Sequence, residues 1–213
     1  AVLAQATGMS GVLFAAIAAC LPILVTGGIH MDGYLDTVDA LSSHQTCEKK
    51  LAIMKDANCG AFAVIYGGVY LLAYAGFAYE VFAAGHILLI CPLFVLSRAL
   101  SGLCAVNLPN ARKSGMLCAF TSGVQRRTAT VALTLVGLAA AAGMVWMSPT
   151  AGGMAAAFVV VSALKYRRFA LAQFGGVTGD TSGFFLQLCE LCGLIGIWIG
   201  GCLLYTSDAA DDL

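Results

Sequence analysis

Charged residues are scarce in this chain of 213 residues. They make up 10% of it, whereas a soluble domain carries roughly 25%. Hydrophobic residues make up 60%, and the mean hydropathy is +0.90. This shortage of charge excludes an ordinary soluble domain and predicts a chain that lies largely within a membrane. The 11 basic and 11 acidic residues balance, and we expect no nucleic-acid partner.

The chain also lacks a basic segment ahead of its first apolar run, so we expect no cleavable signal peptide. Nine cysteines are present, but the C-x-x-C pair of Cys189 and Cys192 has no second pair to match it. That absence argues against a zinc site and against a disulfide framework. We interpret the cysteines as small packing residues in a reducing compartment.

Apolar runs of about 20 residues, the length that crosses a bilayer, recur along the chain. Because only helices and closed barrels satisfy their backbone groups in lipid, these runs predict an all-α, polytopic integral membrane protein. Gly and Ala within the runs, as between Gly137 and Gly143, suit close helix packing in lipid. About six transmembrane helices are expected. They lie at about 3–25, 61–79, 85–106, 128–148, 150–165 and 183–204.

Lysine and arginine are missing from two of the five loops between these spans. The loops at about 80–84 and 149 have none, whereas the other three hold ten of the eleven basic residues, and the eleventh is Arg98. The positive-inside rule therefore predicts that the three basic loops are cytoplasmic. Their segments are 26–60, 107–127 and 165–182.

Three carboxylates in the first basic loop follow one another at i, i+4 and i+7. Asp32, Asp36 and Asp39 therefore share one face of a predicted helix, directly after the first span. On a soluble protein such a triple is usually a solvated face. Next to a membrane span, the mutual repulsion of clustered carboxylates is usually compensated by a divalent cation, and oxygen-only ligands favour Mg²⁺. The motif predicts phosphate chemistry at a membrane surface.

A glycine-rich stretch, GGVTGDTSG at 175–183, forms a second candidate site. Its glycines let backbone N–H groups approach an anion, and Asp180 can help to cap the helix that follows. A plain loop with a helix cap explains the same pattern. Glu190 lies within the last span, where an acid is usually functional or paired. Arg98 is its natural partner, or else a phosphate ligand.

Together these motifs resemble the cobalamin synthase (adenosylcobinamide-GDP ribazoletransferase) family. The pattern Gly-Gly-x-His-x-Asp-Gly-x-x-Asp-Thr-x-Asp at 27–39 is similar to the family's signature. Three more stretches agree with the family in order and spacing, and Glu190 falls where the family has a glutamate. These stretches lie at 53–62, 97–115 and 175–181. The resemblance runs from about residue 20 to 200.

The resemblance implies a Mg²⁺-dependent phosphoryl transfer at the cytoplasmic (inner) membrane of a prokaryote, with the active site facing the cytoplasm. The 3′-hydroxyl of α-ribazole, or of its 5′-phosphate, would attack adenosylcobinamide-GDP at the phosphorus nearest the corrinoid. The products would be adenosylcobalamin, or its 5′-phosphate, and GMP. An attacked pyrophosphate needs cations to neutralise its spread charge, so the aspartate cluster and basic loops fit this reaction.

Residue roles are carried over onto the matching positions. The expected metal ligands are Asp32, Asp36 and Asp39. His30 is expected to act as a general base or to orient a metal ligand, and Asp56 or Asp180 to complete the metal site or accept a proton. The expected substrate-binding residues are Lys55, Arg98, Gly176, Thr178, Gly179, Thr181 and Glu190.

Two alternatives stay open from the sequence. An ion-coupled transporter would use Glu190 and Arg98 as an intramembrane relay and the aspartates as an ion vestibule. Polar groups would then gather near the middle of the membrane, whereas here they gather toward one face. A phosphotransferase acting on lipid alcohols is the other alternative, but its Ala-Arg pair is absent because Asp36 and Thr37 occupy those positions.

The two ends of the chain differ from the family pattern. The chain starts within an apolar run, so we expect an N-terminal piece to be missing, and residues 205–213 look like a non-native tail. Residues 1–204 are assigned to a single transmembrane catalytic domain.

Membrane lipid is an expected partner, with Lys49 and Lys50 facing anionic headgroups. Whether the chain forms a homo-oligomer is left open.

Overall fold

A computed structural model describes the backbone of residues 8–56, 58–112 and 114–211, and the side chains of these ranges as far as residue 203. Within these ranges the chain is helical and contains no strand, which confirms the predicted all-α class. The elements are α2 (Gly11–Thr26), α3 (Ile29–Ser42), α4 (Cys47–Ile53), α5 (Ala61–Ala83), the 3₁₀ helix η1 (Ile87–Leu89), α6 (Ile90–Asn107), α7 (Met116–Ser122), α8 (Arg126–Met147), α9 (Pro149–Phe174) and α10 (Gly179–Asp211). Helix α10 continues into the proposed tail as far as Asp211, while residues 212 and 213 lie outside the described residues.

Four stretches are long and apolar enough to cross a membrane. They are α5, the η1–α6 unit, α8, and α10 as far as Leu203. The polytopic architecture is confirmed, but the described chain has four spans, or five if α2 and α3 are counted as one bent span, rather than about six. Helix α9 is long enough at 26 residues, but Lys165, Arg167 and Arg168 lie in its second half. The first predicted span, 3–25, is a helix of 16 residues in the structure, and its residues 3–7 fall outside the described part.

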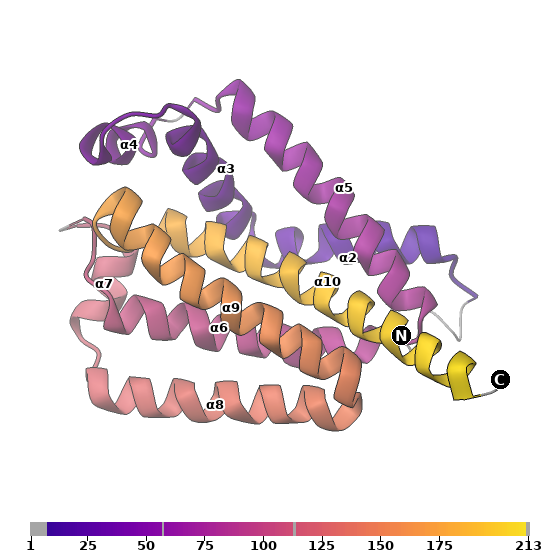
Figure 1. The fold of residues 1–213 in the computed structure, drawn as a ribbon. Coiled ribbons are helices and arrows are strands. Elements are labelled where there is room, and N and C mark those ends of the chain that lie inside the picture. Colours follow the sequence, from indigo (N-terminus) through magenta and orange to yellow (C-terminus); the bar gives the residue numbers. More distant parts are fainter. Residues whose placement is uncertain (1–7, 57, 113, 212–213) are drawn as a thin grey trace.

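Helix α2 ends in a sharp bend, and α3 leaves it at 96°. Gly27 and Gly28 form the bend with φ of +64° and +80°, a left-handed conformation that glycine adopts without steric cost. The bend turns the polar helix α3 across the end of the bundle (Figure 1). With 14 residues and three aspartates, α3 is separate from the four spans.

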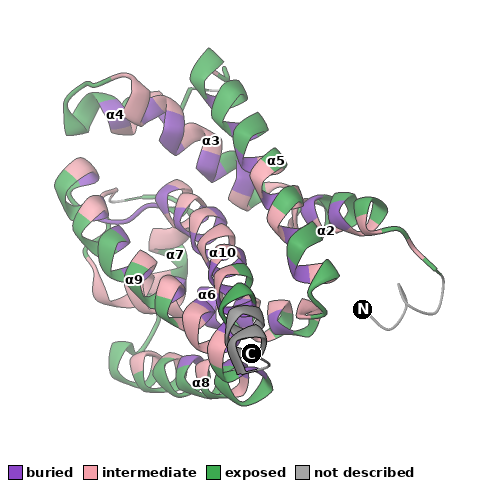
Figure 2. Ribbon diagram, turned by 45° about the vertical axis from the view of Figure 1, so that its right-hand side comes forward, coloured by how far each residue is buried: buried purple, intermediate pink, exposed green. Residues whose placement is uncertain are grey.

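Helix α10 is the centre of the fold and packs against α9, α3, α5 and α6 (Figure 1). Small residues permit the closest of these contacts. A Cβ added at Gly196 would lie 2.7 Å from the Cα of Ala155, and one at Gly200 would lie 2.5 Å from the Cα of Ala151. Such backbone-to-backbone packing is typical of helices that associate in lipid. Large apolar residues such as Leu72 on α5 and Leu135 on α8 are exposed on the outside, as expected of a surface that faces lipid (Figure 2).

The three basic loops lie at one end of the bundle, as the charge pattern predicts. Figure 1 shows α4, α7 and the turn from α9 to α10 together at the left, with the described chain's two ends toward the right. The α5–η1 and α8–α9 connections lie at the opposite end. The polar segments of the sequence therefore meet at one end of the helix bundle, which is where the site lies.

Candidate functional site

Carboxylates from two helices meet at this end of the bundle. Helix α3 crosses the start of α10 at very short range. A Cβ added at Gly33 would lie 2.7 Å from the carbonyl oxygen of Asp180, and one at Gly183 would lie 2.8 Å from that of His30. Because both positions are glycine, the two backbones can touch. This contact brings Asp180 of α10 next to Asp32 and Asp36 of α3; these three residues are called the carboxylate cluster below.

The carboxylate cluster carries more negative charge than its surroundings neutralise. Partial burial, and after it the charges of Asp32, Asp180 and Asp39, raise the pKa of Asp36 to about 6, although Arg112 acts in the opposite direction. Asp36 therefore lies close to three other carboxylates and to one guanidinium. Such a set of oxygen donors is the kind that Mg²⁺ takes in proteins.

Asp39 is turned away from its expected role as a metal ligand and toward the start of α5. Its two carboxylate oxygens accept the backbone N–H groups of Gly60 and Ala63, the latter at 2.9 Å. A carboxylate at the first turn of a helix satisfies free N–H groups and complements the helix dipole. A side chain at position 60 would clash, because an added Cβ would lie 2.7 Å from Asp39 Oδ1. Asp39 therefore fixes α5 to α3 beside the cluster.

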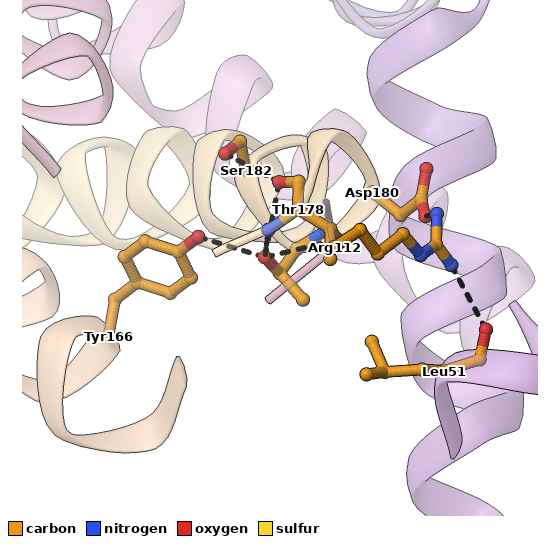
Figure 3. A network of polar contacts seen from close by, with 7 residues as sticks. Leu51, Arg112, Tyr166, Thr178, Asp180 and Ser182 are labelled. Carbon is orange, nitrogen blue, oxygen red and sulfur yellow. Dashed lines mark hydrogen bonds and ion pairs between the residues drawn. The ribbon is translucent and has the colours of Figure 1, made fainter. Parts of the chain in front are cut away.

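Arg112 is a site residue to which the sequence analysis gave no role. Its Nη1 donates to Asp180 Oδ2 at 2.9 Å, and its Nη2 donates to the carbonyl oxygen of Leu51 at 3.2 Å (Figure 3). The buried Nε has no hydrogen-bond partner among the described residues. The signal for this residue is the Ala111-Arg112 pair, which lies within the stretch 97–115 that resembles the family. Nothing local in that pair indicates that it reaches the start of α10.

The glycine-rich stretch forms a helix cap, as its plain interpretation proposed. The Thr178 N–H donates to Thr181 Oγ1 at 2.9 Å, and the Thr181 N–H donates to Thr178 Oγ1 at 3.1 Å. The Tyr166 hydroxyl donates to the same Thr181 oxygen at 3.1 Å (Figure 3). Both threonines are buried. Their hydroxyl groups are therefore occupied within the protein. These contacts do not support the predicted role of the two threonines in substrate binding.

The two glycines predicted to bind substrate lie in different surroundings. A Cβ added at Gly176 would lie 2.3 Å from the carbonyl oxygen of Pro109, so this glycine is needed for packing against segment 109–111. Gly179 has nothing within 4 Å of an added Cβ. It lines a cavity of about 80 Å³ together with Arg112, Asp180 and residues of the 114–118 segment. This cavity, the α10 cavity below, places an arginine beside the first turn of a helix, an arrangement that suits an anion.

Arg98 and Glu190 form the predicted ion pair between α6 and α10. Glu190 is buried, and Ser97 also donates to it at 3.3 Å. The guanidinium of Arg98 lies 5.0 Å from the centroid of the Phe94 ring, a cation–π contact. The pair joins α6 to α10, and both of these hydrogen bonds are accepted by Oε1 of Glu190.

His30 lies close enough to the Arg98–Glu190 pair for the charge of Arg98 to act on it, and it also contacts the start of α10. It is partly buried at the start of α3, and its backbone carbonyl touches Gly183 of α10. Burial, and after it the charge of Arg98, lowers the pKa of His30 from its usual value. A neutral imidazole at this place can accept a proton.

Two predicted site residues are not brought to the cluster. Lys55 and Asp56 are exposed in the loop between α4 and α5. Asp56 Oδ1 accepts the N–H of Asn58 at 3.0 Å and its side-chain amide at 2.8 Å, and these bonds lower the pKa of Asp56. Asp56 therefore closes a local turn.

Lys50, expected to face lipid, is instead buried and donates to Gln173 of α9, so that expectation is wrong.

Among the residues that the structure describes, no three His, Cys, Asp or Glu side chains are placed to hold a metal ion as they stand. The contacts above explain this, since Asp39 caps α5 and Asp180 is held by Arg112. The donor chemistry of the carboxylate cluster nevertheless fits Mg²⁺, because its charge exceeds that of the single guanidinium beside it. The aspartate triple remains a prediction, with Asp180 better placed than Asp39.

Comparison with known proteins identifies the chain. The family model described as cobalamin-5-phosphate synthase matches residues 1–198. This chain belongs to that family. Among proteins named adenosylcobinamide-GDP ribazoletransferase, that of Lachnoclostridium phytofermentans is 40% identical over 200 residues, covering 92% of this chain and 76% of the relative. Those of Sinorhizobium sp. and Stutzerimonas stutzeri are each 33% identical, covering 84% and 89% of this chain and 71% and 76% of the relatives.

No solved structure matches the chain. The family makes the chain a transferase of cobalamin biosynthesis. The sequence resemblance is thereby confirmed, and the transporter and lipid-alcohol alternatives are set aside. Three of the four stretches that carried the resemblance meet at the site, in α3, the 109–112 segment and the start of α10. The fourth, 53–62, supplies the exposed loop between α4 and α5.

Proposed function

We propose that this cobalamin-5-phosphate synthase family member joins adenosylcobinamide-GDP to α-ribazole, or to its 5′-phosphate, in a Mg²⁺-dependent phosphoryl transfer. The single observation that carries the proposal is the contact of Gly33 with Asp180, which sets the α3 carboxylates beside Arg112 and the α10 cavity. The name shared by the relatives, adenosylcobinamide-GDP ribazoletransferase, indicates the two substrates.

In the proposed reaction, the 3′-hydroxyl oxygen of α-ribazole forms a bond to the phosphorus nearest the corrinoid. The bond between that phosphorus and the bridging oxygen breaks, and GMP leaves with the bridging oxygen and its electron pair. The hydroxyl proton passes to a base of the protein. The products are a cobamide phosphodiester and GMP, so atoms and charge balance.

Arg112 and the first turn of α10 would hold the pyrophosphate. The cavity between them is small, at about 80 Å³, which suits a phosphate group rather than a whole nucleotide. Gly179 leaves the approach to the helix backbone open. Arg112 is a planar fork of donors with a buried Nε free of partners within the described chain. It can therefore donate a hydrogen bond to a phosphate oxygen while it keeps its bond to Asp180.

Asp32, Asp36 and Asp180 would hold Mg²⁺, with Asp39 fixing the geometry of α3 against α5. A bound Mg²⁺ neutralises the charge that spreads over the phosphate oxygens during transfer. The carboxylates need such a cation, because partial burial and the neighbouring aspartates raise the pKa of Asp36 to about 6.

His30 is the best-placed base. It is partly buried beside Gly183, its pKa is lowered by burial and by Arg98, and it lies two residues from Asp32. A neutral imidazole can take the proton of the attacking hydroxyl. Asp56 faces away in its own turn, which favours His30 over it.

We further propose that the site faces the cytoplasm at the prokaryotic inner membrane. The support is the charge pattern, because the three loops rich in Lys and Arg lie at the end of the bundle that holds the site. Thr46→Cys and Ala172→Cys lie at exposed positions in two of these segments. Labelled in sealed cells or inverted vesicles, on a background without accessible native cysteines, they should react from the same side. Labelling from opposite sides would contradict a single site.

The proposed reaction is tested with purified protein in liposomes. Adenosylcobinamide-GDP and Mg²⁺ are supplied with α-ribazole, with α-ribazole 5′-phosphate, or with neither, and products are identified by mass. We expect GMP and a cobamide in equal amounts only when an acceptor is present. GMP release without an acceptor would show hydrolysis in place of transfer, and no GMP at all would reject these substrates.

A further inference from the structure

The outer face of α9 carries positive charge that the proposed reaction does not use. Lys165, Arg167 and Arg168 are all exposed, and neither ion pair of the described chain involves them. The opposite face of α9 points inward, where Tyr166 reaches Thr181 and Ala170 is fully buried. The three cations therefore lie on the exposed side of α9 rather than on the side that packs against α10.

Apolar side chains flank these cations in a pattern set by the helix. Val161, Leu164, Lys165, Arg168 and Leu171 recur at three- and four-residue intervals and so share one face of α9. The three apolar members are 49%, 60% and 40% exposed. With Arg167, these residues line a surface hollow of about 540 Å³, called the α9 hollow below. One helix face thus offers cations and apolar surface side by side.

This combination indicates the chemistry of the occupant. Exposed Val161 and Leu164 lie on the side of the cations nearer the middle of α9, which packs along the spans α8 and α10. Acyl chains cover such a surface in a bilayer, and the cations then stand at the level of the headgroups. A free phosphate would contact the cations but not the apolar side chains beside them.

We propose that the α9 hollow binds the phosphodiester headgroup of an anionic phospholipid, with Lys165 and Arg168 on the phosphate and Val161, Leu164 and Leu171 along the acyl chains. The proposal is independent of the reaction, because it rests on the outer face of α9 alone. It adds a lipid contact on α9 to the one expected of Lys49, which is exposed, and replaces the one expected of the buried Lys50.

The test measures bound lipid on the full chain in neutral detergent by native mass spectrometry during titration with phosphatidylglycerol. Lys165→Gln/Arg168→Gln is compared with Arg126→Gln/Arg127→Gln, which removes the same charge from two exposed positions at the start of α8. Each cation near an anionic surface contributes about a factor of five, so the α9 double variant should bind the lipid about 30-fold more weakly. The control variant should bind as the wild type does.

Competition separates the sources of phosphate. Phosphatidylcholine should not displace the bound phosphatidylglycerol, and inorganic phosphate at the same concentration should not displace it either. Equal binding by both double variants would overturn the site on α9. Displacement by inorganic phosphate would show a free-anion site, and displacement by phosphatidylcholine would show an unselective lipid surface; either result overturns the proposal.

Discussion

The two ion pairs of the described chain differ in where they lie and in what they can do. Arg98–Glu190 joins α6 to α10 within the bundle, and the Glu190 side chain is only 3% exposed. Arg112–Asp180 lies at the end of the bundle, with side chains 21% and 25% exposed, next to the α10 cavity. The inner pair is closed by Ser97 and Phe94, whereas the outer pair borders open space. Two ion pairs whose acids both lie on α10 can therefore have different roles. The inner pair holds two helices together, and the outer pair is placed to contact a substrate.

The largest effect should come from the carboxylate side of the outer site. Asp36→Asn and Asp180→Asn should each lower turnover by at least about 10²-fold, because each removes an oxygen donor from the carboxylate cluster. GMP release in liposomes measures this. Glu48→Gln, an exposed acid on α4, is the matched control and should keep normal turnover. Normal rates in both aspartate variants would remove the cluster from the mechanism.

The guanidinium of the outer pair should matter almost as much. Arg112→Ala should lower turnover by about 10²-fold with little change in thermal stability, since the charge that faces the phosphate is lost. Arg112→Lys should recover part of the activity, because it keeps the charge but not the planar fork. Turnover and melting temperature are measured on the same preparations. A large loss of stability in Arg112→Ala would instead assign this pair a structural role like that of Arg98.

Loss of the inner pair, Arg98–Glu190, should lower stability more than it lowers turnover. Arg98→Met leaves the buried Glu190 without its cation and should destabilise the protein by about 2–3 kcal/mol, less than the roughly 3–5 kcal/mol of a fully buried pair because Arg98 is partly exposed. Arg98→Met/Glu190→Gln should regain most of that stability. Thermal unfolding in detergent measures both. If the double variant is stable and folded yet inactive, the pair contacts substrate after all.

The smallest effect is expected in the α4–α5 loop. Lys55→Gln and Asp56→Asn should each change turnover by less than about fivefold, since both side chains are exposed and Asp56 only closes a turn. Steady-state kinetics with adenosylcobinamide-GDP give the measurement. A loss of about 10²-fold at either position would show that this loop moves onto the substrate, and would restore the role that the sequence motif suggested.

Periodicity and local motifs predicted the helices and the end of the bundle at which the polar loops gather. They also predicted the pairing of Arg98 with Glu190, because a buried acid in a span needs a partner. The bend at Gly27 and Gly28 was not predicted, since two adjacent left-handed glycines leave no trace in hydropathy. It sets the predicted polar helix α3 at 96° to α2.

The role of Arg112 depends on contacts between distant parts of the chain, which a local pattern does not contain. Gly33 and Gly183 matter only because α3 meets α10, and Gly176 only because it meets Pro109. Asp39 shows the limit of helical spacing. It shares a face with Asp32 and Asp36, yet its oxygens are taken by the start of α5. Spacing predicted which carboxylates lie together, and the neighbouring helix decided which of them remain available.

The central claim is that the carboxylate cluster beside Arg112 binds the divalent cation of the reaction. Electron paramagnetic resonance of Mn²⁺ added to the purified protein tests this without turnover. We predict one bound Mn²⁺ per chain, displaced by Mg²⁺, lost in Asp36→Asn and retained in Glu190→Gln. Binding that persists in Asp36→Asn and Asp180→Asn, or that is lost only in Glu190→Gln, would show that the carboxylate cluster does not hold the cation.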